Sequence, residues 1–189
     1  GVRWYGDGSN RSDILVLRDG IVSFATSGTA RGIDWDGNCN SLTIEHFGVV
    51  GTPGVGANRP KYGVHIRNTS GGSAPAIGRF LDLEIDYPDD DGIRIDTGAD
   101  YDFVAPYING SVIGSGIYVA GLSDDTVRVI GGKSIGNNQY GIENTARVVA
   151  ANIDLSSNSV GIASGTVGSK AERFFLDTNG YLTLSGGNP

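Results

Sequence analysis

The sequence of 189 residues offers little metal-binding or redox chemistry: it has one cysteine (Cys39), two histidines (His46 and His65) and no methionine. A lone cysteine excludes a disulfide framework and a cysteine-rich metal cluster. So few nitrogen and sulfur ligands also leave a zinc site without its usual ligand set. No apolar run approaches the roughly 18 residues of a membrane-spanning helix, so we expect no membrane insertion.

Basic side chains are outnumbered. Fourteen lysines and arginines stand against 21 aspartates and glutamates, which gives a net charge of −7. Nucleic-acid-binding proteins gain affinity by placing clustered cations on the phosphate backbone, and anionic membrane surfaces attract the same kind of cluster. The composition therefore excludes both of these partner classes.

Helical periodicity is also missing, because no stretch shows the i, i+3, i+4, i+7 apolar pattern of a sustained helix. Glycine, in contrast, supplies 31 positions. A glycine followed by isoleucine or valine recurs at intervals of 20 to 31 residues, at Gly32-Ile33, Gly63-Val64, Gly92-Ile93, Gly116-Ile117, Gly141-Ile142 and Gly161-Ile162. A regular recurrence of this length is the signature of a repeat architecture.

Each repeat holds short runs in which apolar and polar residues alternate. One run follows the glycine pair, as in Gly92-Ile93-Arg94-Ile95, and a second comes later, as in Leu81-Asp82-Leu83-Glu84-Ile85. Alternation with period two predicts strands, and the Gly, Asn and Asp clusters between the runs predict turns. One such repeat cannot bury its apolar face alone, so we expect the repeats to stack into a coil of parallel strands. In this coil the glycines would allow the tight corner at which a strand begins.

Two repeats carry an apolar residue, then an asparagine, then Gly-Ile: Ile135…Asn138…Gly141-Ile142 and Leu155…Asn158…Gly161-Ile162. This pattern resembles the right-handed parallel β-helix of pectate-lyase-like proteins. The resemblance implies an all-β, single-stranded right-handed parallel β-helix of about six or seven rungs over residues 20–168. Short, acidic, glycine-rich rungs are most similar to bacteriophage tailspikes, tail fibres and appendages.

Outside the coil we expect two end segments. Residues 1–19 are predicted to form an N-terminal cap. Residues 169–189 are predicted to form a β-hairpin with Asn179-Gly180 at its turn, acting as a cap or an inter-subunit clasp. The resemblance to phage spikes implies a homotrimer located on a virion tail, outside the host cell.

Alignment of the repeats on the Gly-Ile pair predicts two outward columns of side chains. The second position after each glycine reads Asp34, His65, Arg94, Tyr118, Glu143, and the fourth reads Asp36, Arg67, Asp96, Ala120, Thr145. With rungs about 4.8 Å apart, Asp36 and Asp96 would flank Arg67 at a separation near the wide end of that used by inverting glycosidases. Asp36, Asp96, Arg67 and Arg94 are therefore the candidate catalytic residues.

The same columns have a structural interpretation, because opposite charges on adjacent strands form ladders that stabilise a sheet without any chemistry. For carbohydrate binding, the candidates are an aromatic ring, Trp35, together with the outward column residues His65, Tyr118, Asp34 and Glu143. The alternative for the aromatic residues is that they simply suit strand positions.

No cofactor is expected, with calcium as the one alternative. The run Asp82, Glu84, Asp86, Asp89-Asp90-Asp91 offers carboxylate oxygens, which calcium prefers, or else keeps a turn solvated. A second oxygen-rich run begins at Asp34 but has Cys39 where a calcium loop requires glycine.

Three functions are compatible with these observations. The first is a receptor-binding domain of a viral tailspike or tail fibre that recognises bacterial surface polysaccharide on the host. The second is a polysaccharide depolymerase, a hydrolase or lyase, on the same scaffold. The third is a purely structural shaft or adhesin repeat. The fold alone does not decide among them, because function depends on the site.

Overall fold

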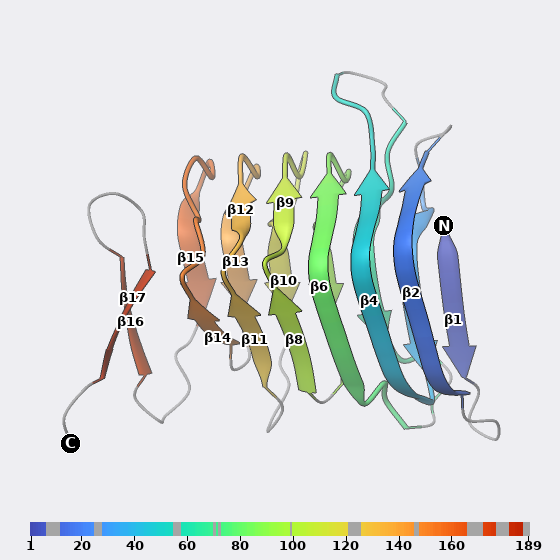
Figure 1. Ribbon diagram of the computed structural model, residues 1–189. Helices are drawn as coiled ribbons and strands as arrows, with labels where there is room; N and C mark the ends of the chain where they lie inside the picture. Colours follow the sequence, from blue (N-terminus) through green and yellow to red (C-terminus); the bar gives the residue numbers. More distant parts are fainter. Residues whose placement is uncertain are drawn as a thin grey trace.

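The computed structural model describes residues 1–6, 12–24, 28–54, 58–69, 71, 73–98, 100–120, 126–145, 148–165, 172–176 and 182–186. Its regular secondary structure is entirely strand, arranged in two parallel sheets that face each other and one separate hairpin (Figure 1). Within these ranges no helix is long and apolar enough to cross a bilayer.

Sheet A consists of short strands that pair in parallel. Its strands, in spatial order, are β1 (Val2–Gly6), β3 (Arg31–Gly37), β5 (Tyr62–Arg67), β7 (Ile93–Ile95), β10 (Ile117–Val119), β13 (Tyr140–Asn144) and β15 (Gly161–Gly165). Each pairs in parallel with the next, so that Ile93, Ile117 and Ile142 lie directly beside one another. The Gly-Ile recurrence therefore marks successive turns, as predicted.

Sheet B forms the opposite wall. It begins with three long strands, β2 (Ser12–Ser23), β4 (Cys39–Val50) and β6 (Ile77–Asp86). In later turns it continues as pairs of shorter strands, β8 (Asp100–Val104) with β9 (Tyr107–Asn109) and β11 (Val127–Ile130) with β12 (Lys133–Ile135), and then as β14 (Val148–Ala151).

The coil is right-handed. In Figure 1 the strands of sheet B run upward in front, those of sheet A run downward behind, and the chain advances from right to left. The result is a parallel β-solenoid of about five turns, close to the predicted six or seven rungs. The all-β, parallel β-helix class is confirmed.

The core is a continuous apolar file between the sheets. Inward residues of both walls have essentially no exposed surface, among them Ile33, Val64, Phe80, Ile95 and Phe103. The rings of Phe80 and Phe103 stack with centroids 4.4 Å apart. Because each turn places an aliphatic or aromatic side chain over its counterpart in the previous turn, burial is shared along the whole axis.

The repeated glycines are required by packing rather than by backbone conformation. None of Gly32, Gly63, Gly92 and Gly116 has a φ in the left-handed region. A Cβ on Gly92 would instead lie 2.4 Å from Cγ2 of Ile108 and 2.6 Å from the carbonyl oxygen of Gly116. The other three glycines likewise face the carbonyl oxygen of the next repeat's glycine, at 2.4 to 2.9 Å. The glycines do mark the corners as predicted, but the reason expected for them, conformational freedom, is wrong: they are required by the close approach of one turn to the next.

The two ends of the chain differ in how they relate to the coil. β1 and β2 pair in parallel with β3 and β4, so the described part of residues 1–19 belongs to the first turn of the coil. At the other end, β16 (Glu172–Leu176) and β17 (Leu182–Gly186) form the expected antiparallel pair as a separate two-stranded sheet. The Asn179-Gly180 turn lies outside the described residues.

The asparagine stack is displaced by one residue from the predicted register. Asn158 accepts hydrogen bonds at Oδ1 from the backbone N–H of Asn137, at 3.0 Å, and from its side-chain amide, at 2.8 Å. Asn137 is fully buried, whereas the predicted Asn138 is exposed. The spacing from Asn137 to Gly141 is one residue longer than the spacing from Asn158 to Gly161. A single spacing rule for the sequence therefore misses Asn137.

We expect Gly92→Ala to lower the free energy of unfolding by about 1–3 kcal/mol, because the added methyl group must push apart two turns that are in contact. Gly48→Ala is the matched control, since a Cβ there meets only the exposed side chain of Ile21, at 3.1 Å. Urea unfolding followed by circular dichroism measures both variants. Equal stability of the two would contradict the packing explanation.

Candidate functional site

The outer face of sheet A carries the two predicted columns in register. Asp34 pairs with His65, His65 with Arg94, Arg94 with Tyr118 and Tyr118 with Glu143. In the second column Asp36 pairs with Arg67. The distance of each residue from the recurring glycine of its turn predicts these neighbours, because the strands of this face begin at that glycine.

Asp34 and Asp36, the first carboxylates of this face, are already held in ion pairs. Arg67 donates two hydrogen bonds to Asp34, both at 2.8 Å. Asp36 has no exposed surface and accepts hydrogen bonds from Arg3 at 3.0 Å and from the backbone N–H and hydroxyl of Thr69 at 2.8 and 2.6 Å. Burial alone would raise the pKa of Asp36, but the Thr69 and Arg3 hydrogen bonds and the Arg67 charge hold it below its usual range. A buried carboxylate that stays ionised is a poor proton donor.

The charged side chains of the neighbouring turn are also paired with one another. The Arg31 guanidinium donates to Nδ1 of His65 at 2.7 Å, so the proton of the neutral ring lies on Nε2, which contacts Asp96 at 2.7 Å. Arg94 donates to the other oxygen of Asp96 at 2.9 Å. Burial would raise the pKa of Asp96, yet the His65 hydrogen bond and the Arg94 charge lower it. These contacts favour the ladder interpretation of Asp36, Asp96, Arg67 and Arg94.

The predicted sugar-binding residues are divided between the inner and the outer face of sheet A. Trp35 is fully buried, with its ring stacked on Trp4 at 5.6 Å and Tyr101 at its edge. Trp35 occupies an inward position of the alternation. A ring buried inside the coil cannot stack on a sugar, so the prediction of Trp35 as a sugar-binding residue is wrong. Tyr118 is half-buried beneath the Arg94 guanidinium, and Glu143 accepts a hydrogen bond from a serine hydroxyl, so both belong to the ladder.

Asp91 is a buried carboxylate that the sequence analysis placed only in an acidic turn. It is 3% exposed and accepts hydrogen bonds from the backbone N–H of Ser115 at 2.9 Å and from Arg94 at 3.1 Å. Burial raises its pKa to about 6, and the nearby Asp90 adds to this effect, which the Ser115 and Arg94 contacts only partly offset. Asp91 is thus a weak point of the ladder at neutral pH.

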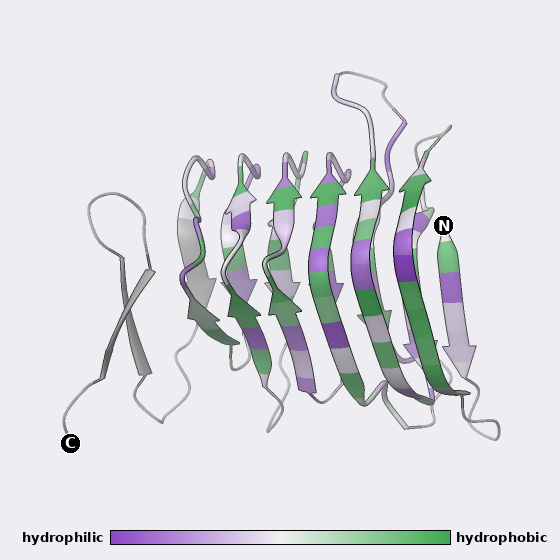
Figure 2. Cartoon of the chain, in the orientation of Figure 1, coloured by the Kyte–Doolittle hydropathy of each residue, from purple (hydrophilic) through white to green (hydrophobic). Residues whose placement is uncertain are grey.

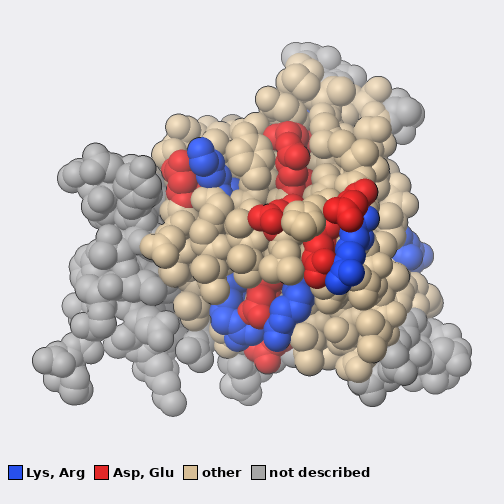
Figure 3. Space-filling view, viewed as in Figure 1, with Lys and Arg blue, Asp and Glu red and all other residues tan. Residues whose placement is uncertain are grey.

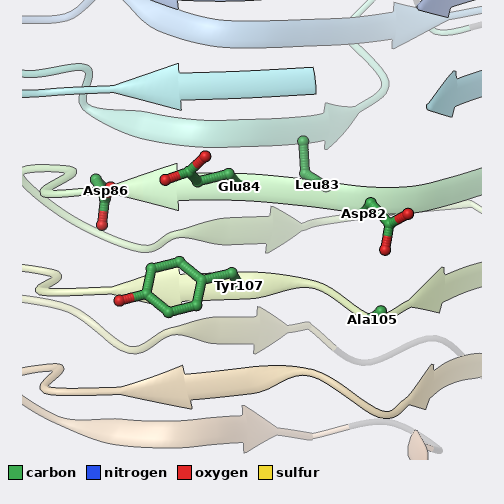
Figure 4. A pocket seen from close by; sticks show the side chains of 6 residues that line it. All are labelled: Asp82, Leu83, Glu84, Asp86, Ala105 and Tyr107. Carbon is green, nitrogen blue, oxygen red and sulfur yellow. The ribbon is translucent and has the colours of Figure 1, made fainter. Parts of the chain in front are cut away.

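A second, different cluster lies on the outer face of sheet B, in an open groove of about 370 Å³ lined by Asp82, Leu83, Glu84, Asp86, Ala105 and Tyr107. Figure 4 shows the carboxylate of Glu84 directed toward Asp86, the ring of Tyr107 on the neighbouring strand, and Asp82 at the opposite end. Glu84 and Tyr107 are register partners across β6 and β9. Tyr107 is 37% exposed, so one aromatic ring remains accessible to a ligand.

The groove follows a bend that recurs in every turn of sheet B. Asp19, His46, Asp82, Ala105 and Asn152 all have φ between 48° and 54°, in the left-handed region. These residues occupy equivalent positions in the strands of sheet B, with Gly131, at a φ of 68°, between Ala105 and Asn152. Aspartate, asparagine and glycine adopt this conformation readily, whereas Ala105 gives no sign of it, so the sequence does not mark the bend in every turn.

Two carboxylates of the groove, Glu84 and Asp86, lack the cations found elsewhere. Among the described residues, neither has a lysine, arginine or histidine in an ion pair; they hydrogen-bond each other, and Asp86 accepts a further hydrogen bond from the Asn109 amide, at 3.2 Å. Burial and the adjacent Asp86 raise the pKa of Glu84. In Figure 3 the acidic atoms over the upper part of β6 and β9 have no basic neighbours, whereas those lower on the same face lie between basic groups.

Asp82 connects the groove to a small exposed ladder. His46 lies 3.3 Å from Asp82 through Nε2 and 3.5 Å from Asp19 through Nδ1. In the described part of the chain no three His, Cys, Asp or Glu side chains converge as ligands of a metal ion would. The second calcium alternative, at Asp34 and Asp36, places carboxylates that already bind arginines.

No protein family, curated protein or solved structure matches this chain. The class that its architecture defines is the parallel β-helix.

The raised pKa of Asp91 predicts a specific pH dependence. With a folded pKa of about 6 against 3.8, this group stabilises the fold fully below about pH 4, and the contribution is lost as the pH rises through 6. Asp91→Asn stays neutral, so its stability relative to the unchanged protein should rise by about 2 kcal/mol between pH 4 and pH 7. Urea unfolding at both pH values measures this, and parallel stability curves would contradict it.

Proposed function

We propose that this chain is the receptor-binding β-helix of a viral tailspike or tail-fibre type of protein, acting outside the host cell on bacterial surface polysaccharide. The observation that carries the proposal is the groove along the bend of sheet B. It is open, and it combines an accessible tyrosine with two carboxylates, Glu84 and Asp86, that form no ion pair with a lysine, arginine or histidine among the described residues.

Sugars suit this combination chemically. Ionised carboxylates accept strong hydrogen bonds from hydroxyl groups, and an aromatic ring offers an apolar face to a sugar ring. The ladder on sheet A supports the same proposal indirectly. Its charged side chains bind one another and make that sheet rigid, so sheet B is the face that remains for a ligand.

A panel of bacterial capsular and O-antigen polysaccharides tests the proposal directly. We expect one class of polymer to bind, and Tyr107→Ala to weaken that binding about tenfold, which corresponds to about 1.4 kcal/mol. Tyr118→Ala is the matched control on the opposite face and should leave affinity unchanged. If no polymer binds, or if both variants bind equally, the groove is not the receptor site.

One observation favours hydrolysis as a second candidate function. A glycosidic bond is cleaved when a carboxyl group donates its proton to the leaving oxygen, and Glu84 is the groove carboxyl group whose pKa is raised, by burial and by the adjacent Asp86. Its proton would pass to the glycosidic oxygen, while Asp82 accepts the proton of the water that adds to the sugar carbon.

At saturating polysaccharide, Glu84→Gln should then stop the release of reducing ends while the bound polymer is still retained. Release at the unchanged rate would leave binding as the sole activity of the groove. The homotrimer expected from the resemblance remains a prediction, and it is independent of this site.

A further inference from the structure

The outer face of sheet B changes charge from strand to strand beside the groove. In the second half of β6 the outward residues after the bend are the acidic Glu84 and Asp86, whereas the first outward residue of β12 is the basic Lys133. Hydrophilic and hydrophobic bands alternate along β6 in Figure 2, because its outward side chains alternate with buried residues of the core. Tyr107 lies between the two charged strands, on β9.

Glu84, Tyr107 and Lys133 form one row across three neighbouring strands. Glu84 and Lys133 are both register partners of Tyr107, from opposite sides. Because adjacent strands lie about 4.8 Å apart, the backbones of Glu84 and Lys133 are separated by roughly 9.6 Å, with the tyrosine midway. Glu84 and Lys133 are exposed and Tyr107 is partly exposed, so a ligand can reach all three side chains.

The two charged ends of this row remain available to a ligand. Among the described residues no ion pair joins Glu84 or Asp86 to a cation, and none joins Lys133 to a carboxylate. Even when Glu84 donates its proton to Asp86, the pair keeps one negative charge. Asp154 lies beside Lys133 on the side away from the groove, where the Ser156 hydrogen bonds and the Lys133 charge lower the pKa of Asp154. In Figure 3 uncharged atoms separate the acidic atoms over the upper part of β6 from the basic group over β12.

We propose that this row recognises a zwitterionic segment of polysaccharide, in which a free amine and a carboxylate lie on neighbouring sugars. The inference rests on the proposed function, and it adds the charge of the ligand and the direction in which the ligand lies. The amine contacts Glu84 and Asp86, a sugar ring covers Tyr107, and the carboxylate contacts Lys133.

Charge complementarity at both ends favours this ligand over a polymer of a single charge. An ammonium group beside the carboxylates of β6 donates charge-assisted hydrogen bonds and is attracted to the face of a nearby tyrosine ring. A wholly acidic polymer places anions against Glu84 and Asp86, and a wholly basic one places cations against Lys133. Both arrangements are unfavourable, because like charges in contact repel each other.

The direction of the row determines how the polymer crosses the coil. Along β6 the outward residue after Glu84 is Asp86, which carries the same charge, and Figure 4 shows both of them on that strand with Tyr107 on the next. The charge reverses only across the strands, along the axis of the coil. A disaccharide covers the distance of roughly 9.6 Å between the two ends, so neighbouring sugars can supply both charges.

Chemically modified forms of the same polymers test the two charges separately. The probes are capsular polysaccharides that carry a free amine and a carboxylate in each repeat, their N-acetylated forms, which lack the positive charge, and their carboxyl-reduced forms, which lack the negative charge. Isothermal titration calorimetry measures the affinities. We expect the unmodified polymer to bind, and either modification to weaken its binding about tenfold.

Variants assign each charge of the ligand to its side chain. Lys133→Gln should weaken binding of the unmodified polymer about tenfold but leave the affinity for the carboxyl-reduced form unchanged, because the group that Lys133 contacts is already missing. The double variant Glu84→Gln with Asp86→Asn should behave in the same way toward the N-acetylated form. Lys61→Gln is the matched control, since it removes the same charge beside Tyr62 on sheet A and should leave every affinity unchanged.

The outcomes separate this inference from the proposed function. Zwitterionic polymers that bind no more tightly than their modified forms would overturn the inference, and so would a Lys133→Gln variant that loses the same affinity for all three forms. If polymers of another charge then bind with a dependence on Tyr107, the proposed function stands without it. If no polysaccharide of any charge binds, both are wrong.

Discussion

The close approach of successive turns at the glycine corners is the constraint on which the rest of the structure depends. At Gly92 the position of a Cβ is already taken by Ile108 from sheet B and by the carbonyl oxygen of the next turn. Only a residue without a side chain fits there, and this requirement recurs in turn after turn. Once the corners are aligned, the side chains that follow fall into vertical files, with Ile93 over Ile117 and Ile142 on the inside.

The same alignment has opposite consequences on the two outer faces. On sheet A it brings arginines between carboxylates, and the hydrogen bonds of Arg67 and Arg94 leave few polar atoms free to act on a ligand. On sheet B the bend at Asp82 opens a groove in which Glu84 and Asp86 lie together without a cation. A coil of this kind can therefore stabilise itself with one face and present chemistry on the other, because its two sheets share only the core.

What the sequence predicts well is whatever depends on counting from the corner. The stacking of Asp34 on His65 and of Tyr118 on Glu143 follows directly from their distance to Gly32, Gly63, Gly116 and Gly141. What it predicts poorly depends on local conformation. Trp35 is a candidate for sugar stacking by residue type, but its position in the alternation points inward, and the fixed spacing to the glycine selects Asn138 whereas Asn137 is the stacked residue. The groove was hidden for a related reason, since the left-handed residues that build it are as different as His46 and Ala105.

The most direct test of the stacked coil is a nuclear Overhauser measurement on protein labelled at the isoleucine and valine methyl groups. The account predicts cross-peaks from Ile93 to Ile117 and from Ile117 to Ile142, with none from Ile93 to Ile142, because these side chains occupy successive turns of one file. Absence of both neighbouring cross-peaks, or a direct one from Ile93 to Ile142, would contradict it.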